Sequence, residues 1–337
     1  MHGRFQRIRA VRSRLRRRRI AFHSDPGGQD DLFVINADGR KLRRLTAGLE
    51  QIAAALWSPD AKRLAFLARP TGSSNIYVIN ADGGGRKRLT GSEGDHYDLV
   101  WSPDGKRLAF SCCDETEQDI FTIKIDGTGR ERLARRAGLP SWSQDGKQIA
   151  FLSFRDGDVE IYVMQADGSN QRRLTRSRGE DANAAWSPDG RKLAFNSRRD
   201  GDDEIYVMNA DGSGQQRLTA SKASDQQPRW SPDGSRILFT SFRNRDPLLR
   251  GIGNAEIMVM NADGSRKSNL TRSRFWEGDP AWSPDGKRIA FAVRHDFGPR
   301  GTFQVALMNS DGSGKHMLPS VTVAGRAANN CCPSWAP

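Results

Sequence analysis

The sequence predicts an all-β protein made of seven copies of one repeat, and three observations predict it. A Trp-Ser-Pro-Asp-Gly motif recurs along the 337-residue chain with a period of about 44 residues. A second turn motif, Asn-Ala-Asp-Gly, follows most copies. No segment keeps a helical spacing of apolar residues, and the 34 glycines suit short strands and tight turns. Because one repeat cannot bury its own apolar face, the copies must stack into a single array.

The units are counted from the aromatic residue that ends the second strand of each. These residues are Phe22, Phe66, Phe110, Phe151, Phe195, Phe239 and Phe291. Six of them follow a tryptophan by nine residues, namely Trp57, Trp101, Trp142, Trp186, Trp230 and Trp282. Phe22 has no such tryptophan, whereas Trp335 has no Phe after it. We therefore predict a closed seven-bladed β-propeller over residues 20–337, in which the C-terminal strand completes the first blade and removes both open edges.

Each unit is expected to form four antiparallel strands, as in residues 181–219. The first strand ends at Trp186, and Ser187-Pro188-Asp189-Gly190 form a tight turn, because proline presets φ and Asp and Gly favour the later positions. The second strand is Lys192–Phe195, and the third is Glu204–Met208. The second turn motif then leads into a fourth strand that ends at Leu218.

Spacing separates a rigid face of the ring from a variable one. Trp to Phe is always nine residues, and the second-turn Asp to the next Leu is always seven. The separation between the repeat Phe and the second-turn Asp is 16 residues in five units but 24 and 20 in the last two. The separation between the Leu and the next Trp is usually 12 residues, but it is nine from Leu133 to Trp142. Because strands alternate in direction, the rigid turns share one face, the turn face, and the variable connections share the other, the loop face. We expect the loop face to be the working surface.

The two motifs resemble the TolB-type, WD-like propeller repeats, whose hallmarks are W-S-P-D-G-x-x-[IL]-A-F and I-Y-V-[MI]-N-A-D-G. The resemblance covers residues 20–337 and implies four-stranded blades around a central channel. It also implies a non-catalytic scaffold that binds a protein or peptide partner at the channel mouth. TolB has six blades, so six is the alternative to seven. Related propellers mostly work outside the cytoplasm, which suggests an extracytoplasmic or periplasmic location, but no signal peptide is visible and the location is left open.

The net charge of +13 is concentrated at the N-terminus, where residues 1–19 contain nine arginines and no acid. This Arg-rich arm is expected to be disordered, since like charges at this density resist folding. Binding of nucleic acid or an anionic surface is its alternative role. The arm has no apolar segment after it, so it is not a complete secretion signal. No apolar run is long enough to span a membrane.

A ring of polar residues, each five positions before a blade tryptophan, is the first candidate site. It consists of His96, Asp181, Asp225, Glu277 and Asn330. If the innermost strands line the channel, these residues crowd its mouth and could bind a cation or a basic peptide segment. Asp181, Asp225 and Glu277 could hold a divalent metal, which is the weaker alternative. The remaining interpretation is that the mouth is merely polar.

The long connection after Phe239 is the second candidate site. It carries Leu248, Leu249 and Ile252 among arginines, as a partner-docking loop would, although it could also fold back over the channel. Trp276, the one tryptophan outside the repeat pattern, is added to this partner-binding set. The paired cysteines Cys112-Cys113 and Cys331-Cys332 also fall on the loop face, either as buried small side chains or as disulfides or a thiol site. Arg155 and Arg199 are expected to form surface ion pairs.

The sequence argues against catalysis. It has no Gly-x-Ser-x-Gly elbow, P-loop or dinucleotide motif, and its five histidines share no offset from the repeat. We therefore expect no cofactor, no catalytic residue and a monomer that binds a protein or peptide. The alternative function is a metal-dependent lyase or hydrolase of polysaccharide that uses the acids at the channel mouth.

Overall fold

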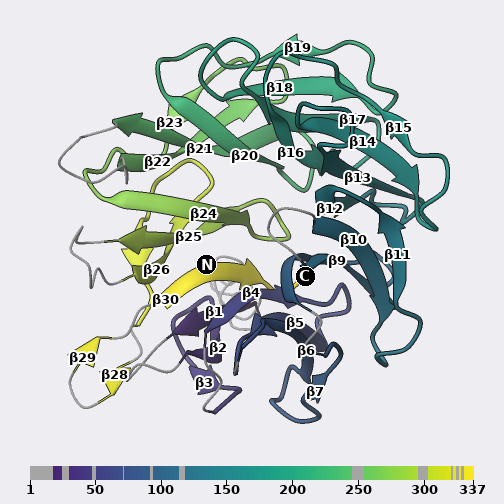
Figure 1. Cartoon of the computed structure of the whole chain (residues 1–337). Helices are drawn as coiled ribbons and strands as arrows, with labels where there is room; N and C mark the ends of the chain where they lie inside the picture. The colour runs from purple at the N-terminus through teal and green to yellow at the C-terminus, as the bar shows by residue number, and fades with distance from the viewer. Residues whose placement is uncertain are drawn as a thin grey trace, which may run out of the picture.

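Seven four-stranded antiparallel sheets form a ring in the computed structural model, as the spacing predicts (Figure 1). The structure describes residues 18–24, 30–47, 51–70, 72–91, 94–113, 118–244, 254–294, 303–319, 322–323, 326–327 and 330–337. Only the backbone is described for residues 243–244, 322–323, 326–327 and 330–332. The described residues form no helix long and apolar enough to cross a membrane.

The strands follow the predicted order in every blade. Blade 1 contains β1 (Arg19–Ser24), β2 (Asp31–Asn36), β3 (Arg43–Arg44) and β30 (Asn330–Trp335); blade 2 contains β4 (Ile52–Trp57), β5 (Arg63–Ala68), β6 (Asn75–Asn80) and β7 (Lys87–Arg88). Blade 3 contains β8 (Asp95–Trp101), β9 (Arg107–Cys113), β10 (Gln118–Lys124) and β11 (Glu131–Ala134); blade 4 contains β12 (Ala137–Trp142), β13 (Gln148–Ser153), β14 (Glu160–Gln165) and β15 (Arg172–Arg173).

The remaining blades repeat the arrangement. Blade 5 contains β16 (Asp181–Trp186), β17 (Lys192–Ser197), β18 (Glu204–Asn209) and β19 (Gln216–Arg217); blade 6 contains β20 (Ser224–Trp230), β21 (Arg236–Asn244), β22 (Asn254–Asn261) and β23 (Ser268–Asn269). Blade 7 contains β24 (Trp276–Trp282), β25 (Arg288–Arg294), β26 (Phe303–Asn309) and β27 (His316–Met317). A small hairpin of β28 (Thr322–Val323) and β29 (Arg326–Ala327) lies in the last connection and was not expected from the sequence.

The C-terminal strand closes the ring, which confirms the predicted closure. Figure 1 shows the yellow β30 beside the purple β1, and the two strands pair antiparallel, with Ile20 opposite Trp335. The Ala336 amide donates to the Arg19 carbonyl (2.8 Å), and the Trp335 indole donates to the Ala281 carbonyl of blade 7 (3.1 Å). The first blade is therefore built from both ends of the chain.

The last two residues of the predicted arm are part of the propeller. β1 begins at Arg19, whose guanidinium lies over the Trp57 ring of blade 2 (4.5 Å to the centroid). Arg18 forms an ion pair with Asp285 of blade 7 (2.7 Å). Residues 1–17 of the arm lie outside the described residues.

The apolar core lies between neighbouring blades. All seven repeat phenylalanines are at most 1% exposed. Phe22 and Trp335 of blade 1 pack with Leu307 of blade 7, and Trp186 of blade 5 packs with Val163 of blade 4. Since every blade needs the next to bury its faces, the ring is one cooperative core.

The turn face repeats the same hydrogen bonds around the ring. In blade 5 the Ser187 hydroxyl donates to Asp189 Oδ1 (2.6 Å), and the Arg191 amide donates to the same oxygen (3.1 Å). Gly190 closes the turn at a φ of 69°, in the left-handed region that glycine tolerates best. Equivalent Ser-to-Asp bonds occur in blades 2, 3, 4, 6 and 7 at 2.6–2.7 Å. The motif aspartates are therefore turn residues, as predicted.

A β-bulge in each of six inner strands decides what faces the channel. In each of these blades the register between the inner strand and the second strand shifts just before the blade tryptophan. In blade 5 the shift falls between Ala182 and Ala185, which are four residues and one residue before Trp186. The residue three before each tryptophan takes a positive φ of 49–56°; these residues are Ala54, Asp98, Leu139, Asn183, Gln227 and Asp279. Because a bulge rotates the backbone, side chains before and after it no longer follow one alternation.

Candidate functional site

The predicted polar ring is buried rather than exposed at the channel mouth. The side chains of His96, Asp181, Asp225 and Glu277 are at most 3% exposed. Asn330 begins β30, and only its backbone is described. The expectation that these residues crowd an open mouth is therefore corrected: four of them lie inside the blades, where the bulge that follows turns the strand.

Internal partners engage the three buried acids. Asp181 Oδ2 accepts from Arg199 Nη2 (2.8 Å), Asp225 Oδ1 accepts from the Ser241 hydroxyl (2.6 Å), and Glu277 Oε1 lies 3.2 Å from Lys315 Nζ. Burial raises the pKa of Asp181, although the Ser197 hydroxyl and Arg199 act in the opposite direction. No group of three His, Cys, Asp or Glu side chains among the described residues could hold a metal. Each of the three acids is thus engaged by a different side chain.

His96 occupies the same position in blade 3 and is held by backbone groups. Its Nδ1 donates to the Ser74 carbonyl (2.6 Å), and its ring lies 5.4 Å from the Phe110 ring. Nε2 is buried and has no hydrogen-bond partner among the described residues. Burial lowers the pKa of His96, and the Ser74 carbonyl and Asp95 only partly oppose the shift. The neutral imidazole is the form that this site favours.

The channel itself is lined by residues that the sequence reasoning missed. A cavity of about 450 Å³ is bounded by the bulge residues and their neighbours, among them Asp98, Leu139, Asn183 and Gln227. The signal that could have located the bulge is a proline two residues before the tryptophan, as at Pro140, Pro228, Pro280 and Pro333, because proline inside a strand marks an edge or a bulge.

A second cavity, of about 710 Å³, continues the channel toward the turn face. It shares Ser141, Ala185 and Arg229 with the first and is edged by the indole rings of Trp142, Trp186, Trp230 and Trp282. Arg229 lines both cavities and its side chain is exposed to them. The protein around the channel still desolvates the guanidinium, which lowers the pKa of Arg229, and the charge of Asp279 opposes this shift. The channel therefore combines mostly apolar walls with a few polar groups, as ligand sites do.

Leu248, Leu249 and Ile252 of the predicted docking loop lie outside the described residues. Trp276 is described: it is partly buried at the start of β24 and packs edge-on against Phe303 of β26, with ring centroids 5.5 Å apart. This aromatic pair lies on the loop face, at the end of the blade where the variable connections begin.

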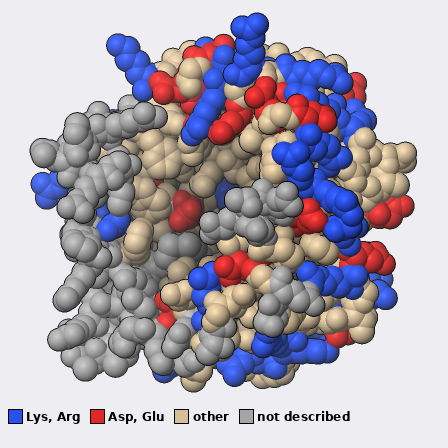
Figure 2. All heavy atoms as spheres, viewed as in Figure 1, with Lys and Arg blue, Asp and Glu red and all other residues tan. Residues whose placement is uncertain are grey.

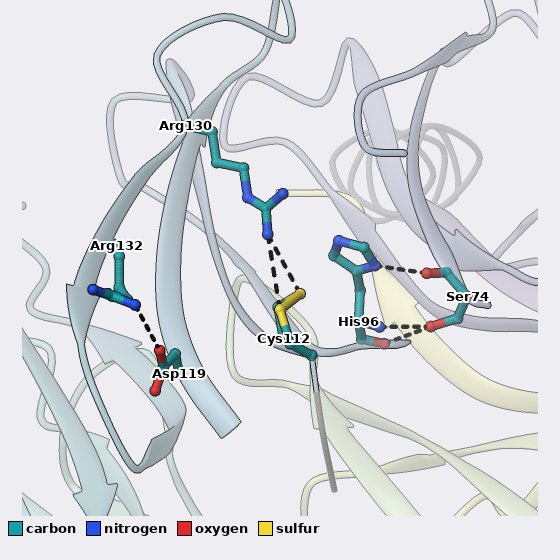
Figure 3. The surroundings of a disulfide bond; sticks show 7 residues. Ser74, His96, Cys112, Asp119, Arg130 and Arg132 are labelled. Carbon is teal, nitrogen blue, oxygen red and sulfur yellow. Dashed lines mark hydrogen bonds and ion pairs between the residues drawn. A yellow bond between two sulfur atoms is a disulfide. The ribbon is translucent and has the colours of Figure 1, made fainter. Parts of the chain in front are cut away.

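The first cysteine pair forms a disulfide between neighbouring residues. Cys112 and Cys113 are joined at the end of β9, and Arg130 Nη2 lies 3.4 Å and 3.9 Å from the two sulfur atoms (Figure 3). Cys113 takes a φ of 110°. Of the interpretations given for this pair, the structure has the disulfide, and Cys112 is also fully buried. The side chains of Cys331 and Cys332 lie outside the described residues.

The comparisons with known proteins agree with this architecture. The family model of the TolB beta propeller domain matches residues 16–134, 86–184 and 140–337. No curated protein sequence matches the chain. A structure described as a TolB from Agrobacterium tumefaciens is 26% identical, with a TM-score of 0.57, and the match covers 75% of this chain and 88% of that one.

Two further structures have the same fold at lower identity. TolB from Acinetobacter baumannii is 22% identical, with a TM-score of 0.60, over 94% of this chain and 82% of that one. An oligogalacturonate lyase from Vibrio parahaemolyticus is 16% identical, with a TM-score of 0.64, over 81% and 82% of the two chains. Propellers of this shape thus include an enzyme, so the fold alone does not decide the activity. The three matches of the family model together cover all seven blades. The chain therefore belongs to the TolB beta-propeller domain family.

Proposed function

We propose that this protein is a non-catalytic scaffold that binds a protein or peptide partner on its loop face at the channel mouth. The observation that carries the proposal is the difference between the two faces of the ring. On the turn face, six turns have the same spacing and the same Ser-to-Asp hydrogen bond. The length differences between repeats are all on the loop face, which is where binding surfaces of repeat proteins usually vary.

The proposal assigns direct contact with the partner to Leu248, Leu249, Ile252 and Trp276. The buried ring residues have a different part in it. Because His96, Asp181, Asp225 and Glu277 are enclosed and bonded within the blades, they hold the beginnings of the inner strands in place beneath the connections. Membership in the TolB propeller family supports a binding function.

A pull-down with identification of the captured proteins tests this assignment. The bait is the full chain, compared with a variant that lacks residues 248–252. The deletion should lose a partner that the wild-type chain captures, while its melting temperature stays close to that of the wild type. Lys147→Ala, on the exposed turn face, is the control and should capture the partner normally. Equal capture by the deletion variant and the wild type would count against the docking loop.

A metal-dependent lyase or hydrolase of polysaccharide is the competing function. Its support is the fold likeness to an oligogalacturonate lyase, at 16% identity. Elemental analysis of the purified protein separates the two. Under the binding proposal the protein carries no stoichiometric divalent metal and does not cleave oligogalacturonate when a divalent metal is added. A tightly held metal together with cleavage would favour the enzyme.

An extracytoplasmic location is part of the same proposal. Disulfides persist mainly in oxidising compartments, and Cys112 and Cys113 are disulfide-bonded. Fractionation of native cells, followed by sequencing of the mature N-terminus, tests the location. Recovery of the protein only in the cytoplasmic fraction, with both thiols reduced, would contradict it.

A further inference from the structure

Blades 4 and 5 contain the same arginine arrangement, and the complete version is in blade 5. There the guanidinium of Arg199 lies over the rings of Phe195 and Tyr206, 5.7 Å and 4.6 Å from their centroids. Each of its nitrogens has an acceptor: Nε donates to Ser197 Oγ (2.8 Å), Nη1 to Gln215 Oε1 (2.8 Å) and Nη2 to Asp181 Oδ2 (2.8 Å). A buried carboxylate thus completes the shell of this arginine.

Blade 4 repeats every part of this arrangement except the carboxylate. Arg155 lies over Phe151 and Tyr162, 5.6 Å and 4.8 Å from the centroids. Its Nε donates to Ser153 Oγ (3.0 Å) and its Nη1 to Gln171 Oε1 (2.7 Å). Nη2, the nitrogen that Asp181 engages in blade 5, is buried and has no acceptor among the described residues.

The missing group can be named because the repeat aligns the two blades. Asp181 pairs with Ser197 in the sheet of blade 5, and Ala137 pairs with Ser153 at the same register in blade 4. Alanine therefore stands where blade 5 has its acid. A buried N–H of a charged group is costly to leave without an acceptor, so Arg155 favours an acceptor supplied from outside.

A cavity beside Arg155 gives such an acceptor a place to bind. It has a volume of about 380 Å³ and lies between the outer strand of blade 3 and blade 4; its lining residues are Arg132, Leu133, Ala134, Arg135, Arg136, Arg155 and Gln171. We refer to it as the arginine pocket. It lies at the connection from Leu133 to Trp142, which is three residues shorter than in most units and belongs to the loop face.

The charge around the arginine pocket is strongly positive. Four arginines line it. Two acids lie near it. Asp119 of β10 is 3.4 Å from Arg132 Nη1 and accepts a hydrogen bond from the Arg136 amide (3.0 Å). Asp156 follows Arg155 and accepts a hydrogen bond from the hydroxyl of Tyr162, on whose ring Arg155 lies. Figure 2 shows Lys and Arg side chains gathered on the right of the ring, over the part that Figure 1 labels β10 to β15, with acids among them. Two carboxylates cannot balance four guanidinium groups, so the pocket attracts anions.

We propose that the arginine pocket binds a carboxylate side chain of an acidic peptide segment, because Arg155 lacks the buried acid that its counterpart Arg199 has in blade 5. The argument for a carboxylate is internal to the molecule, because the equivalent arginine already holds one in the same surroundings. Guanidinium groups also match the planar geometry of carboxylates well. This inference rests on the proposed function and specifies the chemistry of the partner: an acidic segment that reaches the loop face between blades 3 and 4.

Fluorescence anisotropy with a labelled pentaglutamate peptide tests the proposal on the full chain at low salt. Pentaglutamine is the neutral control peptide. The wild-type protein should bind pentaglutamate and not pentaglutamine. Arg135→Gln should weaken binding by about tenfold, as expected for the loss of one charge-assisted contact. Arg191→Gln removes the same charge from the turn face and should leave affinity within about twofold of the wild type.

The sharpest variant is Ala137→Asp, because it restores the blade 5 arrangement without removing an arginine. The new carboxylate should satisfy Arg155 from inside, abolish pentaglutamate binding and keep or raise the melting temperature. A folded Ala137→Asp protein that still binds like the wild type would overturn the assignment. If the Ala137→Asp variant melts at a much lower temperature than the wild type, the pentaglutamate affinities of Arg155→Met and Arg135→Gln are compared with that of the wild type instead. Unchanged affinity in both variants would also overturn the assignment.

Two further outcomes would contradict the proposal. Equal loss of binding in Arg191→Gln and Arg135→Gln would mean diffuse attraction to a basic surface. Binding of a phosphorylated peptide, with no binding of pentaglutamate, would assign the pocket to phosphate instead of carboxylate. Failure of the pentaglutamate test leaves the proposed function standing, because deletion of residues 248–252 tests partner capture on a different element.

Discussion

At the scale of single residues, equivalent positions in the repeat differ in how well their polar atoms are satisfied. The indole of Trp186 donates to the Ser141 carbonyl of the preceding blade (3.0 Å), and most blade tryptophans form the same bond. The indole nitrogen of Trp142 is buried and has no partner among the described residues. Trp142 is also the tryptophan that follows the shortened connection from Leu133. The same residue at the same repeat position therefore does not always form the same hydrogen bond.

This difference predicts unequal effects of the same substitution. Trp186→Phe loses an interblade hydrogen bond and should lower the free energy of unfolding by about 1 kcal/mol more than Trp142→Phe does. Trp186→Ala, which also empties the space between blades 4 and 5, should cost about 3–5 kcal/mol. Urea denaturation of the three variants measures these values. Equal losses for the two phenylalanine variants would contradict the role of the Ser141 bond.

His96 predicts a dependence of stability on pH. Its pKa in the folded protein is lowered from 6.5, so near and below that pH the unfolded chain binds more protons than the folded one. The free energy of unfolding should therefore fall as the pH drops from 7 to 5. In His96→Gln this decrease should be smaller. Denaturation curves at the two pH values test the prediction, which fails if both proteins lose the same amount.

At the scale of elements, the Trp-Ser-Pro-Asp-Gly turn is specified by local chemistry. Hydrogen bonds from the Ser187 hydroxyl and then from the Arg191 amide lower the pKa of Asp189. These bonds lie within five residues, so every copy of the motif can form them without help from other blades. The inner strand differs, because its bulge depends on pairing with the second strand.

Removal of one turn carboxylate should therefore have a small and local effect. Asp189→Ala removes the acceptor of two hydrogen bonds on an exposed turn and should lower the free energy of unfolding by about 1 kcal/mol. Amide hydrogen exchange should rise in the turn between β16 and β17 and stay unchanged in blade 1. Protection lost throughout the ring would show that the turn contributes to the whole fold instead.

At the scale of the whole molecule, one strand from the far end of the chain completes the ring. β30 pairs with β1 in blade 1, and the Trp57 indole of blade 2 donates to the Ser334 carbonyl of β30 (3.2 Å). The C-terminal strand thus contacts its own blade and both neighbours. Without it, blade 1 would present an unpaired strand edge to the channel.

Deletion of residues 329–337 should sharply lower the melting temperature and cause oligomerisation. The deletion removes the pairing partner of β1 and the buried Trp335, so blade 1 loses its inner strand. Differential scanning calorimetry and size-exclusion chromatography measure the two effects. An unchanged melting temperature and a monomeric elution volume would contradict the role of the closing strand.

The sequence by itself determined the number of blades, the strand order and the closure. Repeat spacing and turn chemistry are local properties of the chain that tertiary contacts do not change. The closure is predicted because Phe22 lacks a preceding repeat tryptophan and Trp335 lacks a following repeat phenylalanine. Burial of the polar ring could not be predicted from spacing, since Asp181 lies before a bulge whose position depends on pairing between strands.

Only the tertiary structure distinguished Arg155 from Arg199. Both follow a repeat phenylalanine by four residues, and both precede acids in the chain. Their difference lies in the residue that the adjacent strand places beside Ser153 or Ser197, Ala137 in one blade and Asp181 in the other. Sequence patterns report which residues share an element, whereas the hydrogen-bond partners of a buried charge are set by neighbours that the fold brings from elsewhere in the chain.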